Sequence, residues 1–238
     1  MISVCMATYN GMPYIKKQVN SILSQLGEDD ELIVSDDGSV DNTRKMLLSL
    51  QDSRVKLFSN SPNNGVVSNF ENALLHAAGD IIFLSDQDDI WRNDKAIMIS
   101  EKLLTNIMVV SDCAIINEND DILYESYFKR RKSRSGIIKN LYKNSYLGCC
   151  IAFRRELLTY ALPFPTGIHM HDWWLGLIAE MIGTVHFLPE PLVFYRQHQN
   201  NYSETLIGSK NTINERIKRR ISVILPMIIR ARKIITAH

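Results

Sequence analysis

The sequence lacks the glycine-rich phosphate-binding motifs that many nucleotide-binding α/β proteins carry. No G-x-G-x-x-G follows the first apolar segment, and no Walker A motif occurs anywhere in the 238 residues. Both motifs hold phosphate groups on backbone N–H groups at the start of a helix. Their absence argues against ordinary dinucleotide binding and against P-loop chemistry.

Cysteine is scarce, and long apolar runs are missing. Cys5, Cys113, Cys149 and Cys150 lack the spacing of zinc ligands, and the adjacent pair is a poor disulfide candidate. We therefore expect reduced thiols and a cytoplasmic protein. No apolar run reaches the ~18 residues that a membrane span requires. The N-terminus carries no basic-then-apolar segment of the kind that marks a signal peptide.

The overall charge is close to balanced. The chain has 27 Lys and Arg against 26 Asp and Glu, a formal net charge of +1, so we expect no nucleic-acid partner. The segment from Gly208 to His238 is the exception, with eight Lys and Arg and one Glu among isoleucines at near-helical spacing. It predicts a basic amphipathic helix, interrupted by Pro226, that binds a membrane surface or packs on the core or on a second subunit.

The composition is that of an ordinary globular protein, with 45% hydrophobic and 22% charged residues. The first half alternates apolar strand-like segments with amphipathic helical segments. The strands are expected at 2–7, 31–35, 55–58 and 81–84. This alternation predicts right-handed βαβ units and a mostly parallel central sheet with helices on both faces.

Polar side chains gather where three of these strands end. Because the carboxyl ends of parallel strands share one edge of the sheet, residues far apart in sequence should meet in one crevice there. The residues concerned are Thr8, Asn10, Asp36, Asp37, Asp86, Asp88 and Asp89.

The densest of these clusters is Asp86-Gln87-Asp88-Asp89, which directly follows an apolar strand. Three carboxylates so close resist joint ionisation unless a cation or hydrogen-bond donors compensate them. One hypothesis is a divalent cation beside a phosphorylated ligand. The other is an acidic turn that precedes a helix capped by Asn93 or Asp94. A phospho-acceptor receiver domain fits poorly, because its acidic pair would follow the first strand.

The second half is less regular. We expect a helix at 93–104, a strand at 107–112, a hairpin at 114–123 and an apolar strand within 146–153. His171-Asp172-Trp173-Trp174 then opens an apolar helix, where Asp172 is a candidate N-cap. Closing strands are expected at 184–187 and 191–195.

Several stretches together, in this order, resemble the family 2 glycosyltransferases, which have the GT-A fold. The resemblance implies a GT-A domain over 1–203, with a nucleotide-sugar-binding half at 1–118 and an acceptor half at 119–203, followed by the tail at 204–238. The matching stretches are residues 7–11, 34–43, 63–65 with Asn69, 85–89, 171–174 and 195–198.

The resemblance implies a role for each residue of the nucleotide-sugar site. Thr8, Asn10 and Asp36 would line the base and ribose pocket, joined by Asp37 and Asn69. Asp86 would lie near the ribose, and Arg196 would face the diphosphate. Asp88 would be the principal metal ligand, with Asp89 nearby and His198 completing the shell.

The chemistry of such a transfer agrees with these ligands. A diphosphate leaving group gains negative charge as the glycosidic bond breaks, and a hard divalent cation stabilises that charge. Ligation by carboxylate oxygens is typical of Mg²⁺ or Mn²⁺ rather than zinc.

In the acceptor half, the resemblance implies that Asp172 is the catalytic base, which takes the proton of the acceptor hydroxyl. Gly148 would allow close approach of a sugar, and we expect one of Trp173 and Trp174 to face sugar rings and the other to pack. The family often has Glu-Asp where this chain has His171-Asp172, so a second acidic contact is in doubt.

We therefore expect an inverting, metal-dependent transfer of a hexosyl or deoxyhexosyl group, with rhamnosyl as one case, from a dTDP- or UDP-sugar. The acceptor would be a lipid-linked glycan, with the enzyme on the inner face of the cell membrane. The alternatives are a UDP-hexose transferase, a nucleotidyltransferase, which should have a Gly/Arg/Lys-rich loop after the first strand, and a non-catalytic nucleotide-sugar binding module.

Overall fold

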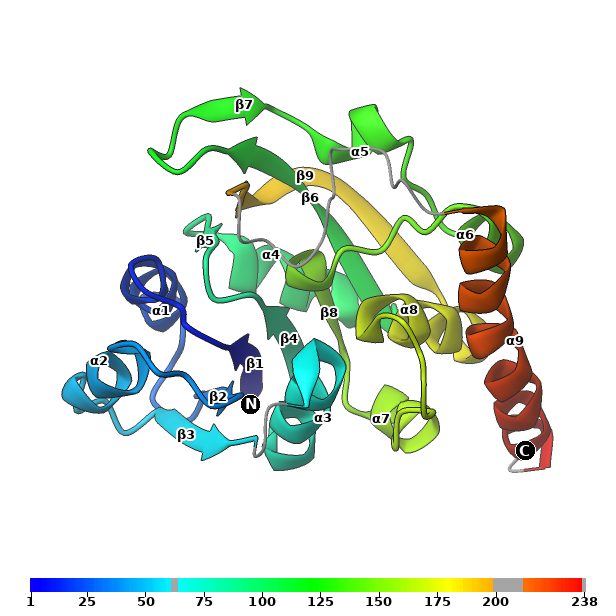
Figure 1. The fold of residues 1–238 in the computed structure, drawn as a ribbon, viewed down its shortest axis with the longest axis horizontal. Coiled ribbons are helices and arrows are strands. Elements are labelled where there is room, and N and C mark those ends of the chain that lie inside the picture. Colours follow the sequence, from blue (N-terminus) through cyan, green and yellow to red (C-terminus); the bar gives the residue numbers. More distant parts are fainter. Residues whose placement is uncertain (61–63, 199–211, 237–238) are drawn as a thin grey trace.

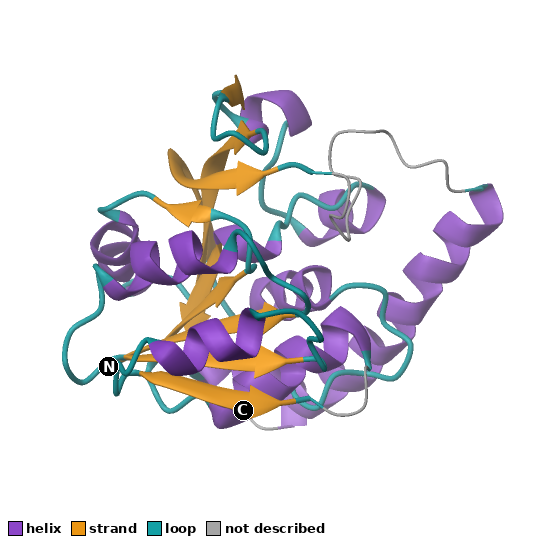
Figure 2. Cartoon of the chain, turned by 60° about the vertical axis from the view of Figure 1, so that its left-hand side comes forward, coloured by secondary structure: helices purple, strands orange, loops and turns teal. Residues whose placement is uncertain are grey.

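A single mixed sheet forms the centre of the computed structural model, which describes residues 1–60, 64–198 and 212–236 (Figure 1). Helices cover both faces of this sheet (Figure 2). The strands are β1 (Ile2–Thr8), β2 (Glu31–Asp36), β3 (Val55–Ser59), β4 (Ile81–Ser85), β5 (Ile90–Trp91), β6 (Met108–Ile116), β7 (Ile122–Tyr124), β8 (Ile151–Arg154) and β9 (Val185–Arg196). The helices are α1 (Ile15–Leu23), α2 (Thr43–Ser49), α3 (Gly65–His76), α4 (Lys95–Leu103), α5 (Tyr127–Arg131), α6 (Ile137–Tyr142), the 3₁₀ turn η1 (Gly148–Cys150), α7 (Glu156–Ala161), α8 (His171–Ile182) and α9 (Ile213–Thr236).

The strand order is β3-β2-β1-β4-β8-β6-β9-β5, with β7 paired to β6. The first four strands in this order are parallel, which confirms the predicted βαβ units. Beyond β4 the sheet is mixed, because β8 runs antiparallel to both β4 and β6. The β4 strand therefore joins a parallel half to a mixed half.

The inner strands are apolar because both of their faces are covered. Every residue of β2 and β6 is buried, as expected for strands between two layers of helices. The core continues under η1 and α8, where Trp174 and Leu175 have no exposed surface. The sheet thus holds its carboxyl-end loops on a rigid base.

Two elements differ from the sequence-based expectation. The two closing strands form one long strand, β9, whose pairing with β6 shifts register between Ser111 and Cys113. The C-terminal helix α9 is continuous through Pro226. The hairpin predicted near 114–123 is confirmed as the β6–β7 pair.

Helix α9 lies along α6 and α8 (Figure 1). One of its faces packs on the body of the protein, where Val223 is fully buried and Met227 nearly so. Arg220 donates hydrogen bonds to the carbonyl oxygens of Leu141 and Tyr142 at the end of α6. Among the described residues, no helix combines the length and hydropathy that crossing a bilayer requires.

Candidate active site

The loops after β1 and β4 are joined by the side chain of Gln87. Its Oε1 accepts hydrogen bonds from Thr8 Oγ1 at 2.6 Å and from the Tyr9 backbone N–H at 2.9 Å. Its Nε2 donates to the Tyr9 carbonyl at 3.1 Å. The expected meeting of polar residues at this edge is therefore confirmed for Thr8 and the acidic stretch. The sequence analysis gave Gln87 no role, although it lies between two acids that were singled out.

The close approach of Gln87 also explains Gly11. A Cβ atom at this position would lie 2.7 Å from Gln87 Oε1 and 3.0 Å from Thr8 Oγ1, so the Gln87 side chain would have to move. The Gly11 N–H donates to Thr43 Oγ1 at 2.8 Å, which ties the same loop to the start of α2. The glycine thus leaves room for Gln87 to make its hydrogen bonds to the loop after β1.

Asp36 ends β2, and Asn10 lies in the loop that follows the neighbouring strand β1. Asp36 is almost fully buried and pairs with the guanidinium of Arg44, with 3.0 Å between Oδ2 and Nη1. Asn10 has a positive φ of 50°, and its Oδ1 accepts from the Val40 N–H at 2.9 Å. Neighbouring β1 and β2 are in register at Thr8 and Asp36, so the residues expected to line one pocket do share one edge.

Asp37 holds the start of α3. Its carboxylate accepts hydrogen bonds from Asn60 Nδ2, from the Asn64 N–H and from the Gly65 N–H, at 2.8 to 3.0 Å. Asn69, one turn into the helix, donates to the Thr8 carbonyl at 3.1 Å. These contacts position loops, and the contacts of Asp37 and Asn69 with a nucleotide remain predictions.

Asp88 and His198 come together although 110 residues separate them in the sequence. His198 Nε2 lies 2.8 Å from Asp88 Oδ2, and both side chains are about nine-tenths buried, with 10% and 12% exposure. The His198 ring stacks on Tyr14 with 5.1 Å between ring centroids. The structure therefore brings together the two residues expected to share a cation.

Arg196 fixes the backbone of the acidic stretch. Its N–H donates to Asp89 Oδ1 at 2.9 Å, and its Nε donates to the Asp88 carbonyl at 2.8 Å. Its guanidinium also donates to the Asn117 carbonyl and forms an ion pair with Asp120. With 1% exposure, Arg196 has its contacts among protein groups, and the expected contact with a diphosphate remains a prediction.

The acidic stretch holds more negative charge than its protein surroundings compensate. Burial, together with the charges of Asp88 and Asp172, raises the pKa of Asp86 to about 8. Burial, together with the charges of Asp88 and Asp86, raises the pKa of Asp89 well above its usual value. Asp89 Oδ2 is buried and has no hydrogen-bond partner among the described residues. A divalent cation fits these observations, because it would favour the ionised acids and satisfy that oxygen.

A thiol lies in the same cluster. Single donor atoms of Asp86, Asp89 and Cys149 all lie within 4.8 Å of one another. The sequence analysis did not include Cys149, because metal spacing was sought among the cysteines alone. Thiolate is a soft ligand that Mg²⁺ and Mn²⁺ disfavour, so the carboxylates remain the expected ligands for a hard cation.

Lys95 is a third residue of the site, after Gln87 and Cys149, that was not expected from the sequence. It is fully buried, donates to the Cys149 carbonyl at 2.7 Å, and lies 3.9 Å from the centroid of the Trp91 ring. Burial lowers its pKa to about 8, opposed by nearby thiols and by Asp89. One lysine at the start of a helix carries no sequence signal for burial, since such residues are usually exposed.

Asp172 lies in the first turn of α8, facing η1. Its Oδ1 accepts from the Trp173 N–H at 2.5 Å, and a backbone hydrogen bond from Gly148 also favours its ionised form. Burial outweighs these donors and raises the pKa of Asp172 to about 7. The charge of Asp172 contributes to the raised pKa of Asp86, so the expected base and the acidic stretch belong to one site.

Gly148 lets the start of α8 approach η1. A Cβ atom there would lie 3.1 Å from His171 Nε2 and 3.8 Å from Asp172 Cβ. His171 is buried and stacks on Phe70 with 3.9 Å between centroids, and burial lowers its pKa to about 3. Close packing of protein thus accounts for this glycine, and its contact with a sugar remains a prediction.

The two tryptophans of α8 are both buried. Trp174 has no exposed surface, and its Nε1 donates to the Ala161 carbonyl at 2.9 Å, so it packs in the core and presents no face to a ligand. Trp173 is 7% exposed, and its Nε1 donates to the Asn140 carbonyl at 3.0 Å. An acceptor contact remains a prediction for Trp173.

Comparison with known proteins gives consistent results. A family model described as "Glycosyl transferase family 2" matches residues 3–160. The Escherichia coli UDP-Glc:alpha-D-GlcNAc-diphosphoundecaprenol beta-1,3-glucosyltransferase WfgD is 34% identical over 186 residues, which cover 76% of this chain and 70% of the relative. The dTDP-rhamnosyl transferase RfbG of Shigella flexneri is 28% identical over 232 residues, which cover 90% of this chain and 77% of the relative.

The fold has close counterparts among solved structures. S. aureus TarS 1-349, in complex with UDP-GlcNAc, superposes with a TM-score of 0.67 at 19% identity over 84% of this chain. The chain covers 59% of that TarS structure and 66% of an uncharacterized glycosyltransferase, alr2836, from Nostoc sp.. The structural match thus supports the fold over most of this chain. The longer proteins extend beyond the matched region.

Proposed function

Because the chain belongs to glycosyl transferase family 2, we propose that it catalyses inverting, metal-dependent transfer of a hexosyl or deoxyhexosyl group from a nucleotide-diphospho-sugar to a lipid-linked glycan. The observation that carries this proposal is the convergence of Asp88, His198 and Asp86 with Asp172 at one edge of the sheet. A cation site next to a buried carboxyl base is what such a transfer requires.

Each group has a distinct part in the proposed reaction. Asp172 accepts the proton of the acceptor hydroxyl as that oxygen attacks the anomeric carbon. Its raised pKa of about 7 suits this task, because a base works best near the operating pH. Thr8, Asn10 and Asp36 hold the nucleoside, and Asp86 lies toward the ribose.

The cation, Mn²⁺ or Mg²⁺, would be held by Asp88 and His198, with Asp89 nearby. When bound, it supplies Lewis-acid stabilisation of the departing diphosphate. Arg196 supports this site indirectly, since it holds the Asp88 carbonyl and the Asp89 carboxylate in place.

Two donors have specific support. Transfer from dTDP-rhamnose is favoured by the likeness to RfbG over 90% of this chain. Transfer of glucose from UDP-glucose is favoured by the higher identity, 34%, to WfgD. The names of WfgD and of a Campylobacter jejuni relative, GalNAc(5)-diNAcBac-PP-undecaprenol beta-1,3-glucosyltransferase, also support an acceptor linked to a lipid diphosphate.

An apolar stripe on α9 supports a position at the inner surface of the cell membrane. Ile217, Ile221, Leu225, Ile228 and Ile229 recur at helical spacing and are 47 to 60% exposed. Such a face on a basic helix suits the boundary between lipid headgroups and acyl chains. The domain at 1–203 would then catalyse the reaction, and the tail at 204–238 would attach the protein to the membrane.

The test is a nucleotide-release assay with a panel of dTDP- and UDP-sugars, Mn²⁺, and a lipid-diphosphate-linked sugar. We expect release with one donor that depends on both the metal and the acceptor. If no donor gives release with Mn²⁺ or Mg²⁺, with or without acceptor, the proposed reaction is wrong.

A further inference from the structure

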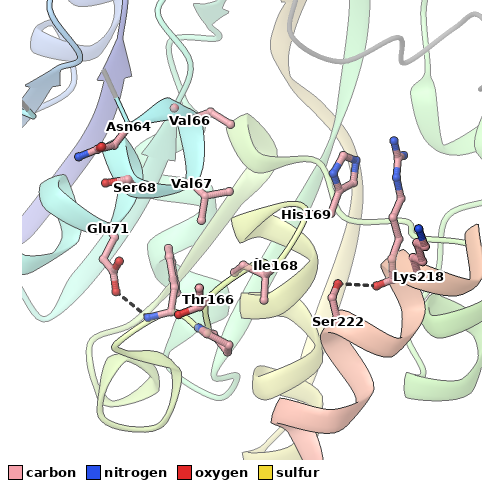
Figure 3. A pocket seen from close by; sticks show the side chains of 15 residues that line it. Asn64, Val66, Val67, Ser68, Glu71, Thr166, Ile168, His169, Lys218 and Ser222 are labelled. Carbon is pink, nitrogen blue, oxygen red and sulfur yellow. Dashed lines mark hydrogen bonds between the residues drawn. The ribbon is translucent and has the colours of Figure 1, made fainter. Parts of the chain in front are cut away.

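A groove of about 700 Å³ lies between α3, the 164–169 loop and α9 (Figure 3). Its volume is within the range of small-molecule sites. Its loop wall ends at His169, three residues before Asp172, so the groove adjoins the proposed base along the chain. No residue expected to bind the nucleotide or the metal lines it.

One part of the groove is apolar. Val66 and Val67 on α3 face Phe164 and Ile168 on the loop, and the two loop residues are buried. Figure 3 shows Val67 and Ile168 on adjoining walls. These four side chains form the apolar wall of the groove.

The opposite rim is basic. His169, Lys218 and Arg219 line it, and Figure 3 shows the His169 ring and the Lys218 side chain on the same side of the groove. Among the described residues, neither the Lys218 ammonium nor the Arg219 guanidinium has a hydrogen bond or ion pair. Burial, together with the charge of Arg219, lowers the pKa of His169. This rim therefore holds positive charge that a bound anion would stabilise.

The nearby acids offset only part of the positive charge of this rim. Glu71 lines the groove on the α3 side, but its Oε1 accepts the Phe164 N–H at 2.5 Å and so holds the loop (Figure 3). Glu215, one turn before Arg219 on α9, is exposed and accepts from the N–H and hydroxyl of Thr212. Lys218 and Arg219 also lower the pKa of Glu215, but two cations beside one acid leave the rim with net positive charge.

An apolar wall opposite a basic rim suits an amphiphile with an anionic head. We propose that the groove binds the diphosphate and the first lipid carbons of the acceptor, with Lys218 and Arg219 as the diphosphate ligands. This inference rests on the proposed transfer to a lipid-linked glycan and names the residues that recognise that acceptor. Arginine and lysine are the usual protein partners of phosphate groups, which accept several charge-assisted hydrogen bonds.

The test measures binding directly, so that it does not depend on catalysis. Farnesyl diphosphate is titrated into the full chain by calorimetry in metal-free buffer, so that no donor-site cation binds the diphosphate, and with excess UDP, which competes for the nucleotide site. We expect binding to the wild type and a loss of about tenfold in affinity for each of Lys218→Ala and Arg219→Ala, as for a charge-assisted contact. Arg232→Ala, on the same helix outside the groove, is the matched control and should bind normally.

Two comparisons identify what the groove recognises. Farnesol should bind at least tenfold more weakly than farnesyl diphosphate, because it lacks the charge that the rim requires. Vesicles of phosphatidylglycerol and phosphatidylcholine should bind Arg219→Ala and Arg232→Ala equally well.

Unchanged affinity for farnesyl diphosphate in both groove variants would overturn the inference. So would a loss of vesicle binding confined to the groove variants, since it would assign the rim to lipid headgroups. Nucleotide release by the wild type is measured separately, so failure of the proposed reaction is distinguishable from failure of this site.

Discussion

At the scale of single residues, burial sets the chemistry of Asp172. The carboxyl is 4% exposed, and its pKa rises to about 7 although three backbone N–H groups favour the ionised form. A group held in this way can accept a proton near neutral pH, but its ionised form costs folding free energy.

The first prediction concerns Asp172→Asn. The amide has nearly the same shape but cannot accept the proton of an acceptor hydroxyl, so we expect transfer to fall by about 10²-fold or more. At pH 8 the free energy of unfolding of the variant should be about 2 kcal/mol higher than that of the wild type, because the substitution removes a buried charge. Urea unfolding and single-turnover transfer measure the two effects. If the variant is less stable than the wild type and keeps its transfer activity, Asp172 is neither a destabilising buried charge nor the base.

The second prediction concerns pH. A base with a pKa of about 7 is mostly protonated below that value, so kcat should fall about tenfold per pH unit below pH 7. Above pH 8 this dependence should level off. A pH profile with saturating donor, metal and acceptor measures it, and a flat profile between pH 5.5 and 7 would exclude Asp172 as the titrating base.

Sequence reasoning at this scale worked for residues within motifs and failed for residues defined by packing. Asp88 and His198 each lie in a stretch that resembles the family, and in the structure Asp88 Oδ2 lies 2.8 Å from His198 Nε2. Gln87 and Lys95 have functions that depend on neighbours distant in sequence, a loop after β1 and the η1 carbonyl. No local pattern encodes such partners.

At the scale of elements, the turn after β1 depends on one tight contact, and the third prediction tests it. Gly11→Ala should lower the unfolding free energy by about 1–2 kcal/mol, because its Cβ would displace Gln87. Gln87→Ala should cost a similar amount, since Thr8 and Tyr9 lose their acceptor. The double variant should be no less stable than Gln87→Ala alone, because the Gln87 side chain that the new Cβ would contact has been removed. Additive losses in urea unfolding would show that the clash is not the cause.

The fourth prediction concerns the exposed stripe of α9. Ile221→Ser with Leu225→Ser should reduce binding to anionic phospholipid vesicles roughly tenfold or more, because burial of each aliphatic side chain contributes about 1.5–3 kcal/mol. Leu75→Ser is the matched control, since Leu75 is 67% exposed on α3. Flotation with vesicles measures the bound fraction. Equal binding by both variants would rule out the stripe as the docking face.

The presence of a helix or strand was easier to predict than the residue at which it ends or whether it continues. The helical spacing of the tail predicted α9, but Pro226 suggested an interruption that the packing of Val223 and Met227 overrides. Similarly, the turn residues near Pro191 suggested two strands, whereas β9 continues with a shift in register because β6 pairs along its whole length.

At the scale of the whole molecule, the buried acids should make stability depend on pH, which is the fifth prediction. Asp86 and Asp172 have folded pKa values of about 8 and about 7, above the usual 3.8, so folding stabilises their protonated forms. Their contribution is lost as pH rises through those values. We expect the unfolding free energy to fall by about 2 kcal/mol between pH 6.5 and 8 in metal-free buffer.

A divalent cation should reverse this trend. Mn²⁺ with UDP should raise the melting temperature more at pH 8 than at pH 6.5, because the cation binds the ionised acids of the native state. In Asp88→Asn this pH-dependent gain should shrink. Equal shifts at both pH values would contradict a cation held by these carboxylates. His171, with a pKa lowered to about 3, affects stability only below this window.

The overall fold followed from the sequence in its first half and less so in its second. Strands separated by amphipathic helices allow few topologies, and the parallel order β3-β2-β1-β4 was among those expected. The second half pairs β6 with β8 and β9, from widely separated segments. Long-range pairing of that kind leaves no periodic signal that would predict its order.

The position of β4 has a consequence for how such proteins diversify. All strands on one side of it come from residues before it in the chain, and all strands on the other side come from residues after it. A single genetic crossover just after Asp89 would therefore exchange one side as a contiguous block and inherit the other intact. The exchanged block would bring its own end of β9, so the new residues there would have to fit Asp88 and Asp89 as Arg196 and His198 do.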